Sequence, residues 1–219
     1  MANILCIETA TTNCSVALSV NGSVIALKED NSKGYSHAER LHVYIDEVLT
    51  IAKMSKAQLN AVAVSKGPGS YTGLRIGVSA AKGLCYALDL PLIAVPTLTS
   101  LAGKVVTSKG VVVAMLDARR MEVYSAVFSS EGSEIRETRA EVLTKESFSE
   151  YLNNGPVTFI GSGVEKFAAI CEHENANFIK DQLPSSAQMA PLAEALYKIS
   201  DTEDVAYFEP YYLKDFISG

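Results

Sequence analysis

Residues 65–77 read Ser-Lys-Gly-Pro-Gly-Ser-Tyr-Thr-Gly-Leu-Arg-Ile-Gly and join an apolar run to a long helical segment. The run, Ala61–Val64, is short and partly β-branched, which predicts a buried strand. The following segment, Tyr71–Leu88, has helical spacing and contains no proline. A buried strand followed by a crossover helix is the building unit of α/β proteins, so this stretch predicts that fold class.

The glycines of this turn have two interpretations. Gly67 and Gly69 allow unusual φ values, and a helix N-terminus can bind an anion through its backbone N–H groups. The spacing matches neither phosphate signature, because no lysine follows Gly73 and Thr72 stands where the dinucleotide pattern requires its last glycine. Nucleotide contact and a plain tight turn both remain open.

Small residues recur along the predicted helix. They are Gly69, Gly73 and Gly77 at four-residue spacing, followed by Ala80, Ala81 and Gly83. Each interior glycine costs about 1 kcal/mol relative to alanine, so the stripe destabilises an isolated helix. Such a stripe is useful where another backbone approaches closely. That backbone belongs either to this protein's own sheet or to a helix of a second chain.

The predicted elements occur in two similar series. The first comprises strands at 3–9, Cys14–Val20, Ser23–Lys28, 61–65 and Leu92–Val95, with helices after Ser36, from Tyr71 and from Thr97 or Thr99. The second comprises strands at Val111–Leu116, Met121–Phe128, Ile135–Leu143, Val157–Ile160 and Ala176–Ile179, with helices at Glu146–Leu152, after Gly163 and from Ser186. We therefore predict two tandem domains, 1–107 and 108–219, each a mixed sheet with an antiparallel hairpin edge and crossover helices. This arrangement resembles the actin-like, RNase H-like (ASKHA) superfamily.

Composition narrows the function classes. The net charge is −6 with a pI near 5.2, and Arg119-Arg120 is the notable adjacent basic pair. Proteins that bind nucleic acid without a partner usually carry a clustered basic surface, so we expect no strong tRNA binding by this chain itself. The scattered cysteines, the short apolar runs and the absence of a basic, apolar leader at Met1 predict a cytoplasmic protein without membrane contact.

Motifs along almost the whole chain resemble the bacterial TsaB (YeaZ) family, a non-catalytic relative of TsaD. They are Ile7-Glu8-Thr9-Ala10-Thr11, His37-Ala38-Glu39-Arg40-Leu41, the glycine stretch, Leu116-Asp117-Ala118-Arg119-Arg120, Glu122-Val123-Tyr124, Glu209-Pro210 and Tyr212-Leu213-Lys214.

The resemblance implies a subunit that works with TsaD and the small ATPase TsaE. That complex transfers a threonylcarbamoyl group to the tRNA adenosine next to the anticodon. The resemblance further implies a homodimer when TsaD is absent, tRNA contact only through the complex, no catalytic residue in this chain and no cofactor held by this chain alone. Any ATP or ADP would then bind at the interface with TsaD.

Carboxylates end the first strand of each predicted domain. Glu8 and Asp117 occupy equivalent positions, and a carboxylate pair facing a cleft is suited to a metal–nucleotide complex. With them we predict Thr9, Thr11, Gly67 and Gly69 as nucleotide or cleft contacts. The alternative function is an independent actin-like or sugar-kinase-like ATPase or phosphotransferase. The turn after Glu8 lacks the glycines of that class, which argues against it.

The histidines argue against a metal site. TsaD-like enzymes carry a His-x-x-x-His pair, which places two imidazoles on one helix face. By element order that pair would fall at Thr97–Leu101, where this chain has no histidine. His37 and His42 are five residues apart and point to different faces, so a metallopeptidase is not expected either.

We predict a partner interface on two helices of the first domain, with the glycine stripe as its flat surface. Its residues are His37, Leu41, Ile45, Tyr71, Gly73, Gly77, Ala80 and Leu84. Arg75 lies one helical step beyond the glycine turn and suits a carboxylate or phosphate, or a solvated salt bridge.

Overall fold

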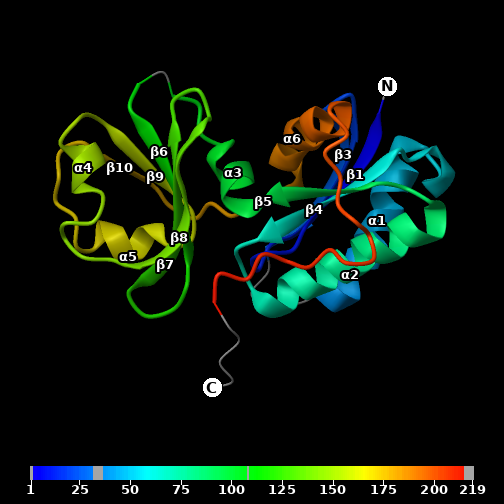
Figure 1. The fold of residues 1–219 in the computed structure, drawn as a ribbon, viewed down its shortest axis with the longest axis horizontal. Helices are drawn as coiled ribbons and strands as arrows, with labels where there is room; N and C mark the ends of the chain where they lie inside the picture. The colour runs from blue at the N-terminus through cyan, green and yellow to red at the C-terminus, as the bar shows by residue number, and fades with distance from the viewer. Residues whose placement is uncertain (1, 32–36, 108, 215–219) are drawn as a thin grey trace. The chain divides into compact units, whose positions relative to one another are not determined.

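The computed structural model describes residues 2–31, 37–107 and 109–214, and it contains two five-stranded sheets (Figure 1). The first series of elements is β1 (Asn3–Glu8), β2 (Cys14–Val20), β3 (Ser23–Asp30), α1 (His37–Ala52), the 3₁₀ turn η1 (Lys56–Gln58), β4 (Ala61–Gly67), α2 (Tyr71–Leu88), β5 (Leu92–Pro96) and α3 (Thr97–Ala102). The second is β6 (Val111–Asp117), β7 (Glu122–Ser129), β8 (Glu134–Val142), α4 (Ser149–Leu152), β9 (Val157–Ile160), α5 (Val164–Ala168), β10 (Ala176–Ile179) and α6 (Ser186–Lys198).

Both sheets have the same topology. The first has the order β3-β2-β1-β4-β5, and the second, read in the same direction, has the order β8-β7-β6-β9-β10, so β6 corresponds to β1 and β9 to β4. In each, the first three strands form an antiparallel meander, and the last two join in parallel after helical crossovers. The predicted duplicated α/β fold is confirmed.

The β2–β3 hairpin turns at Asn21-Gly22, between the two strands predicted at Cys14–Val20 and Ser23–Lys28. Asn21 has φ 51° and Gly22 has φ 77°, the left-handed values that a two-residue type I′ loop requires at both positions. Val20 then pairs with Ser23. Local backbone preference therefore accounts for this turn.

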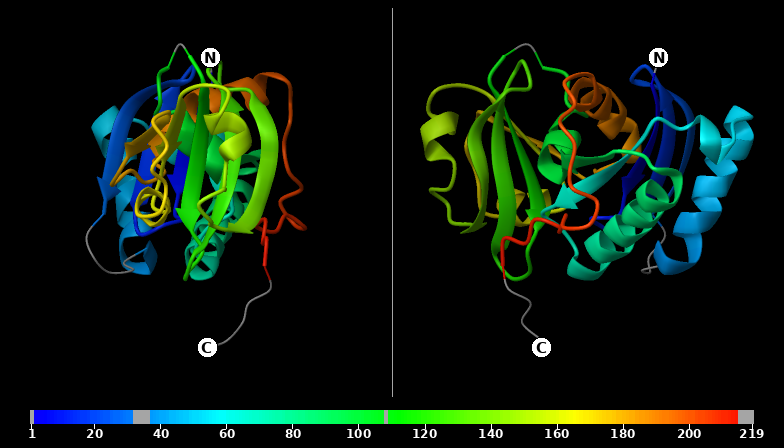
Figure 2. Two further views of the ribbon diagram at one scale, coloured as in Figure 1. Left: turned by 90° about the vertical axis from the view of Figure 1, so that its left-hand side faces the viewer. Right: turned by 45° about the vertical axis from the view of Figure 1, so that its right-hand side comes forward.

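Strand β1 is buried on both faces, and its residues 4–7 form a continuous apolar run. Leu5 and Ile7 face the core shared with α1 and α2, whereas Ile4 and Cys6 face the core shared with α6. Figures 1 and 2 show α6 on one side of this sheet and α1 with α2 on the other. Burial raises the pKa of the Cys6 thiol to about 12, in keeping with a small hydrophobic role.

The two compact units divide the chain differently from the predicted boundary at 107/108. One unit combines Met1–Ser100 with Pro184–Gly219, and the other is Leu101–Leu183. The reason is α6, whose Met189, Ala190 and Ala193 pack on the first sheet rather than on the second. The element order alone could not reveal this, because either sheet has a face that the last helix could cover.

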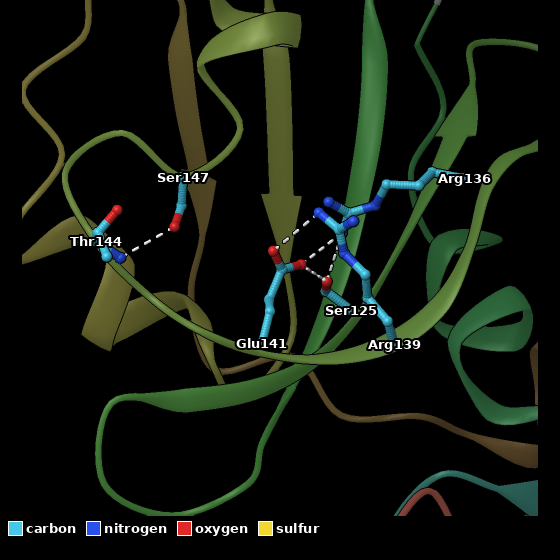
Figure 3. A network of polar contacts seen from close by, with 6 residues as sticks. All are labelled: Ser125, Arg136, Arg139, Glu141, Thr144 and Ser147. Atoms are coloured by element: carbon cyan, nitrogen blue, oxygen red, sulfur yellow. Dashed lines mark hydrogen bonds and ion pairs between the residues drawn. The ribbon is translucent and has the colours of Figure 1, made fainter.

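The second unit has an aromatic core beneath a partly buried polar network. Phe148, Phe159 and Phe167 pack edge to face or tilted, with ring centroids 4.9–5.4 Å apart. The Arg136 guanidinium lies 4.9 Å from the Phe148 ring centroid and forms an ion pair of 2.6 Å with Glu141 (Figure 3). The network therefore joins β8 to the core below it.

Candidate functional site

The glycine turn between β4 and α2 fits tightly against the chain's own backbone. Ser70 donates its N–H to the Ala10 carbonyl oxygen at 2.7 Å. A Cβ on Gly69 would lie 2.7 Å from the Ala10 Cβ, and one on Gly67, whose φ is 110°, would lie 2.7 Å from the Tyr211 carbonyl oxygen. Only glycine fits at these two positions.

This arrangement does not suit a phosphate at the start of α2. The Ser70 N–H and side chain are engaged, because the hydroxyl also accepts the Gly73 N–H at 3.3 Å as the helix N-cap. The Gly67 N–H donates to the Thr97 hydroxyl at 3.2 Å. Of the two interpretations of the turn, the geometry favours the packing one for Gly67 and Gly69.

The stripe on α2 packs on the β1–β2 turn. The Thr9 hydroxyl donates to the Gly73 carbonyl oxygen at 2.8 Å, and both residues are buried. A Cβ on Gly73 would overlap the Thr9 carbonyl oxygen, and one on Gly77 would overlap the Thr9 hydroxyl. Gly73 and Gly77 therefore contact this protein's own β1–β2 turn, and their part in a partner interface stays a prediction.

Glu8 is a buried carboxyl beneath the same turn. Its Oε1 accepts the Ala10 N–H at 2.7 Å, while Oε2 has no hydrogen-bond partner among the described residues. Burial raises the pKa of Glu8 to about 7, although hydrogen bonds from Ala10 and Ser65 partly oppose the shift. With a pKa of about 7, Glu8 still holds its proton in a large fraction of molecules at neutral pH, which suits a structural role better than a metal-binding one.

The remaining polar groups of this turn are used locally. The Thr11 hydroxyl accepts the Asn13 N–H at 3.3 Å, and the Thr11 carbonyl oxygen accepts a 2.7 Å hydrogen bond from His37 Nε2. Asn13 donates its side-chain amide to the Pro184 carbonyl oxygen at 2.9 Å. The turn thus anchors the starts of α1 and α6. Ser36, after which the first helix is predicted to begin, lies outside the described residues.

Asp117 ends β6 of the second unit, the position that Glu8 has in the first. Its Oδ1 accepts the Arg119 N–H at 2.6 Å and pairs with Lys166 Nζ at 2.8 Å. The Asp117 N–H donates to the Ser162 hydroxyl at 3.1 Å. Asp117 is exposed and forms an ion pair with Lys166, whereas Glu8 is buried. The two equivalent positions therefore have different environments. Their joint action on a nucleotide stays a prediction.

A groove of about 760 Å³ lies between α1 and α2. Four of the predicted interface residues line it, namely His37, Tyr71, Ala80 and Leu84. Leu41 and Ile45 instead point into the core with Gly73 and Gly77. The groove residues that sequence reasoning did not assign to the interface are Ala38, His42, Thr72, Arg75, Ile76, Ser79 and Gly83.

The helical spacing of the sequence contained a signal for the groove residues that were not predicted. Tyr71, Arg75 and Ser79 repeat at four-residue spacing on α2, as Gly73 and Gly77 do, but on another face. Both faces carry small or amphipathic residues. The pattern alone did not show which of them faces the sheet.

Residues 97–101, the region where TsaD-like enzymes are expected to carry paired histidines, contribute to packing in this protein. Thr97 is buried and its hydroxyl accepts the Gly67 N–H, and Leu101 is buried as well. In residues 2–31, 37–107 and 109–214, no three His, Cys, Asp or Glu side chains gather in a way that could hold a metal ion. None of the helices in the described part of the chain combines the length and apolar character of a membrane span.

The duplicated mixed sheets define a class, the actin-like α/β proteins. Component A of (R)-2-hydroxyglutaryl-CoA dehydratase from Acidaminococcus fermentans shares this fold, with a TM-score of 0.52 over 92% of this chain and 100% of that chain at 12% identity. YeaZ from Pseudomonas aeruginosa superposes with a TM-score of 0.82 over 97% of this chain and 100% of that one, at 26% identity.

Sequence comparison identifies the family. Residues 32–217 match the family described as TsaD, tRNA N6-adenosine threonylcarbamoyltransferase. The chain is 34% identical to the tRNA threonylcarbamoyladenosine biosynthesis protein TsaB of Escherichia coli K12, over 97% of this chain and 94% of that protein. The chain belongs to the TsaB (YeaZ) family, which confirms the resemblance read from the motifs.

Proposed function

We propose that this protein is a non-catalytic subunit of the complex that transfers a threonylcarbamoyl group to the tRNA adenosine next to the anticodon. Its partners in this proposal are TsaD and TsaE. The observation that carries the proposal is the packing of the α2 N-terminus on Thr9 and Ala10. The elements that would face a phosphate in an actin-like ATPase are used to hold α2 in place.

The positions equivalent to the paired histidines support the same view. A transferase of the TsaD type needs metal-binding imidazoles, and Thr97 and Leu101 serve packing instead. The alternative of an independent ATPase or phosphotransferase has less support. It would need donors directed at a phosphate, and the N–H groups of Gly67 and Ser70 already have partners within the unit.

The groove between α1 and α2 is the surface we propose for TsaD, and for a second copy when TsaD is absent. Its lining combines apolar side chains such as Ile76 and Leu84 with small residues such as Ala80 and Gly83. Small residues let a partner helix approach the α2 backbone closely. In this proposal the acidic chain contributes to tRNA modification by binding TsaD rather than by binding tRNA directly.

Reconstitution tests the proposal. Purified TsaD and TsaE are incubated with tRNA, ATP and a threonylcarbamoyl donor, with or without this protein, and modified adenosine is measured by nucleoside mass spectrometry. We expect product only when TsaD and this protein are both present. Product formed by this protein without TsaD would contradict the proposal. So would ATP turnover by the lone protein that Glu8→Ala and Asp117→Ala abolish.

A further inference from the structure

Arg75 has a defined orientation at the edge of the groove. It lies on α2 one turn after Tyr71, and its Nη1 donates to the Tyr71 hydroxyl at 2.6 Å. Its guanidinium carbon lies 5.2 Å from the centroid of the Tyr71 ring. A long, exposed arginine is thereby held in one place by an aromatic neighbour, which lowers the entropy cost of engaging a ligand.

The C-terminal segment supports this arrangement from outside the helix. Tyr212 packs its ring on Tyr71, with centroids 4.9 Å apart. The segment is fastened to the unit nearby, because Tyr211 donates its N–H to the Lys66 carbonyl oxygen at 2.7 Å. Lys82 of α2 donates to the carbonyl oxygens of Ala206 and Phe208 at 3.1 and 2.9 Å. Figure 1 shows this segment, in red, running beside α2.

The groove has an unusual charge for this chain. Among the residues that the structure describes, its lining contains Arg75 and two histidines but no carboxylate, although the chain carries a net charge of −6. Within the described part of the chain, Arg75 forms no ion pair with a carboxylate. An arginine beside aromatic rings at the rim of an apolar groove has the composition of a binding hot spot.

We propose that Arg75 selects a partner helix that seats its apolar face in the groove and presents a carboxylate to the guanidinium. Tyr71 and Tyr212 act as positioning residues for that guanidinium. The inference rests on the proposed function, in which the partner is the TsaD subunit. A planar guanidinium can bind a carboxylate through two parallel hydrogen bonds, which a lysine cannot reproduce.

A second copy of this chain is a poorer occupant of the same groove. In a two-fold symmetric dimer the same surface meets itself. The lining of the groove would then meet an identical lining, and among the described residues neither copy's lining supplies a carboxylate for Arg75. Charge complementarity therefore favours a different chain over self-association.

Binding of purified TsaD to immobilised variants tests the inference. Arg75→Glu is expected to weaken binding about 100-fold and Arg75→Lys about 10-fold, because the lysine keeps the charge but loses the paired geometry. Lys180→Glu, an exposed change in the second unit with the same effect on net charge, serves as control and is expected to bind normally. Thermal unfolding of each variant is measured alongside.

The positioning role has its own readout. Tyr212→Ala is expected to weaken binding about 5-fold in the wild-type background, whereas Tyr212→Phe keeps the ring and binds normally. In an Arg75→Ala background the Tyr212→Ala change is expected to have no further effect, because the group that it orients is gone. Equal losses from Tyr212→Ala in both backgrounds would overturn the positioning role.

The outcomes separate this inference from the proposed function. If the wild-type protein does not bind TsaD, the proposed function fails, and this inference with it. If the wild type binds and Arg75→Glu binds equally well, only the inference is overturned. Loss of self-association by Arg75→Glu with unchanged TsaD binding would identify a second copy as the occupant and also overturn it. Restored binding of Arg75→Glu by an Asp→Lys or Glu→Lys change on TsaD would support it.

Discussion

The Thr9 hydroxyl donates a 2.8 Å hydrogen bond to the carbonyl oxygen of Gly73 and also lies where a Cβ on Gly77 would be. One buried side chain thus accounts for two glycines of α2. The bond links the end of the first strand to a helix 64 residues later. It holds the start of α2 on the first sheet and leaves Tyr71 and Arg75 on the groove side.

The first prediction concerns two identical substitutions on α2. Gly77→Ala is expected to destabilise the first unit by about 1–3 kcal/mol, because its Cβ overlaps the Thr9 hydroxyl. Gly83→Ala is the matched control. Apart from its chain neighbours and the nearby backbone of α2, no heavy atom of the described residues lies within 4 Å of its Cβ position, so the change is expected to stabilise the protein by up to about 1 kcal/mol. Thermal unfolding measures both, and equal stabilities would contradict the close contact with Thr9.

The second prediction is a pH dependence from Glu8. Its folded pKa of about 7 exceeds the ordinary value of 4.5, so the folded state holds the proton more tightly. The stabilisation is fully present below pH 4.5 and is lost as the pH rises through 7, by an amount on the order of 3 kcal/mol.

Glu8→Gln is expected to remove this loss, so its stability between pH 5 and 8 falls less steeply than that of the wild type, as measured by urea unfolding. The exposed change Asp117→Asn is the control, and identical slopes for Glu8→Gln and the wild type would contradict the buried acid.

The third prediction concerns the network in Figure 3. Burial alone would raise the pKa of Glu141, but hydrogen bonds from Ser125 and Arg136 and the Arg136 charge hold it below its ordinary value. The stabilisation is present above the ordinary carboxyl pKa and is lost as the pH falls through the folded one. Glu141→Gln is expected to destabilise the second unit by about 3 kcal/mol at pH 7, because Arg136 stays largely buried without its counter-charge.

Hydrogen exchange of β7 and β8 reports on that unit separately from the first. Glu137→Gln is the matched control, since Glu137 lies on the same strand and is exposed. If Glu137→Gln increased the exchange rate as much as Glu141→Gln does, the network would have no special role.

The fourth prediction is that the lone protein binds tRNA weakly and without sequence preference. The chain is acidic, with a net charge of −6, and affinity for phosphates depends on clustered basic residues. Fluorescence anisotropy with labelled tRNA measures this at physiological salt, and addition of TsaD is expected to raise the affinity. Submicromolar binding by the protein alone would contradict the expectation.

Much of the fold followed from local and periodic features of the sequence. Left-handed backbone preference places the hairpin at Asn21-Gly22, and the unbroken apolar run of β1 indicates burial on both faces. The repeated element order determined two sheets of one topology, because hairpin and crossover connections leave few alternatives. The motifs also determined the family.

Only the tertiary structure decided which face of α2 is free. The glycine face and the Tyr71–Arg75 face share the same helical spacing, and the difference between them is the contact with Thr9, far away in the chain. The docking of α6 on the first sheet and the ring contact of Tyr212 with Tyr71 are likewise long-range contacts. Periodicity shows that a helix has an apolar face, but the fit of side-chain shapes and hydrogen bonds across the fold determines which surface that face meets.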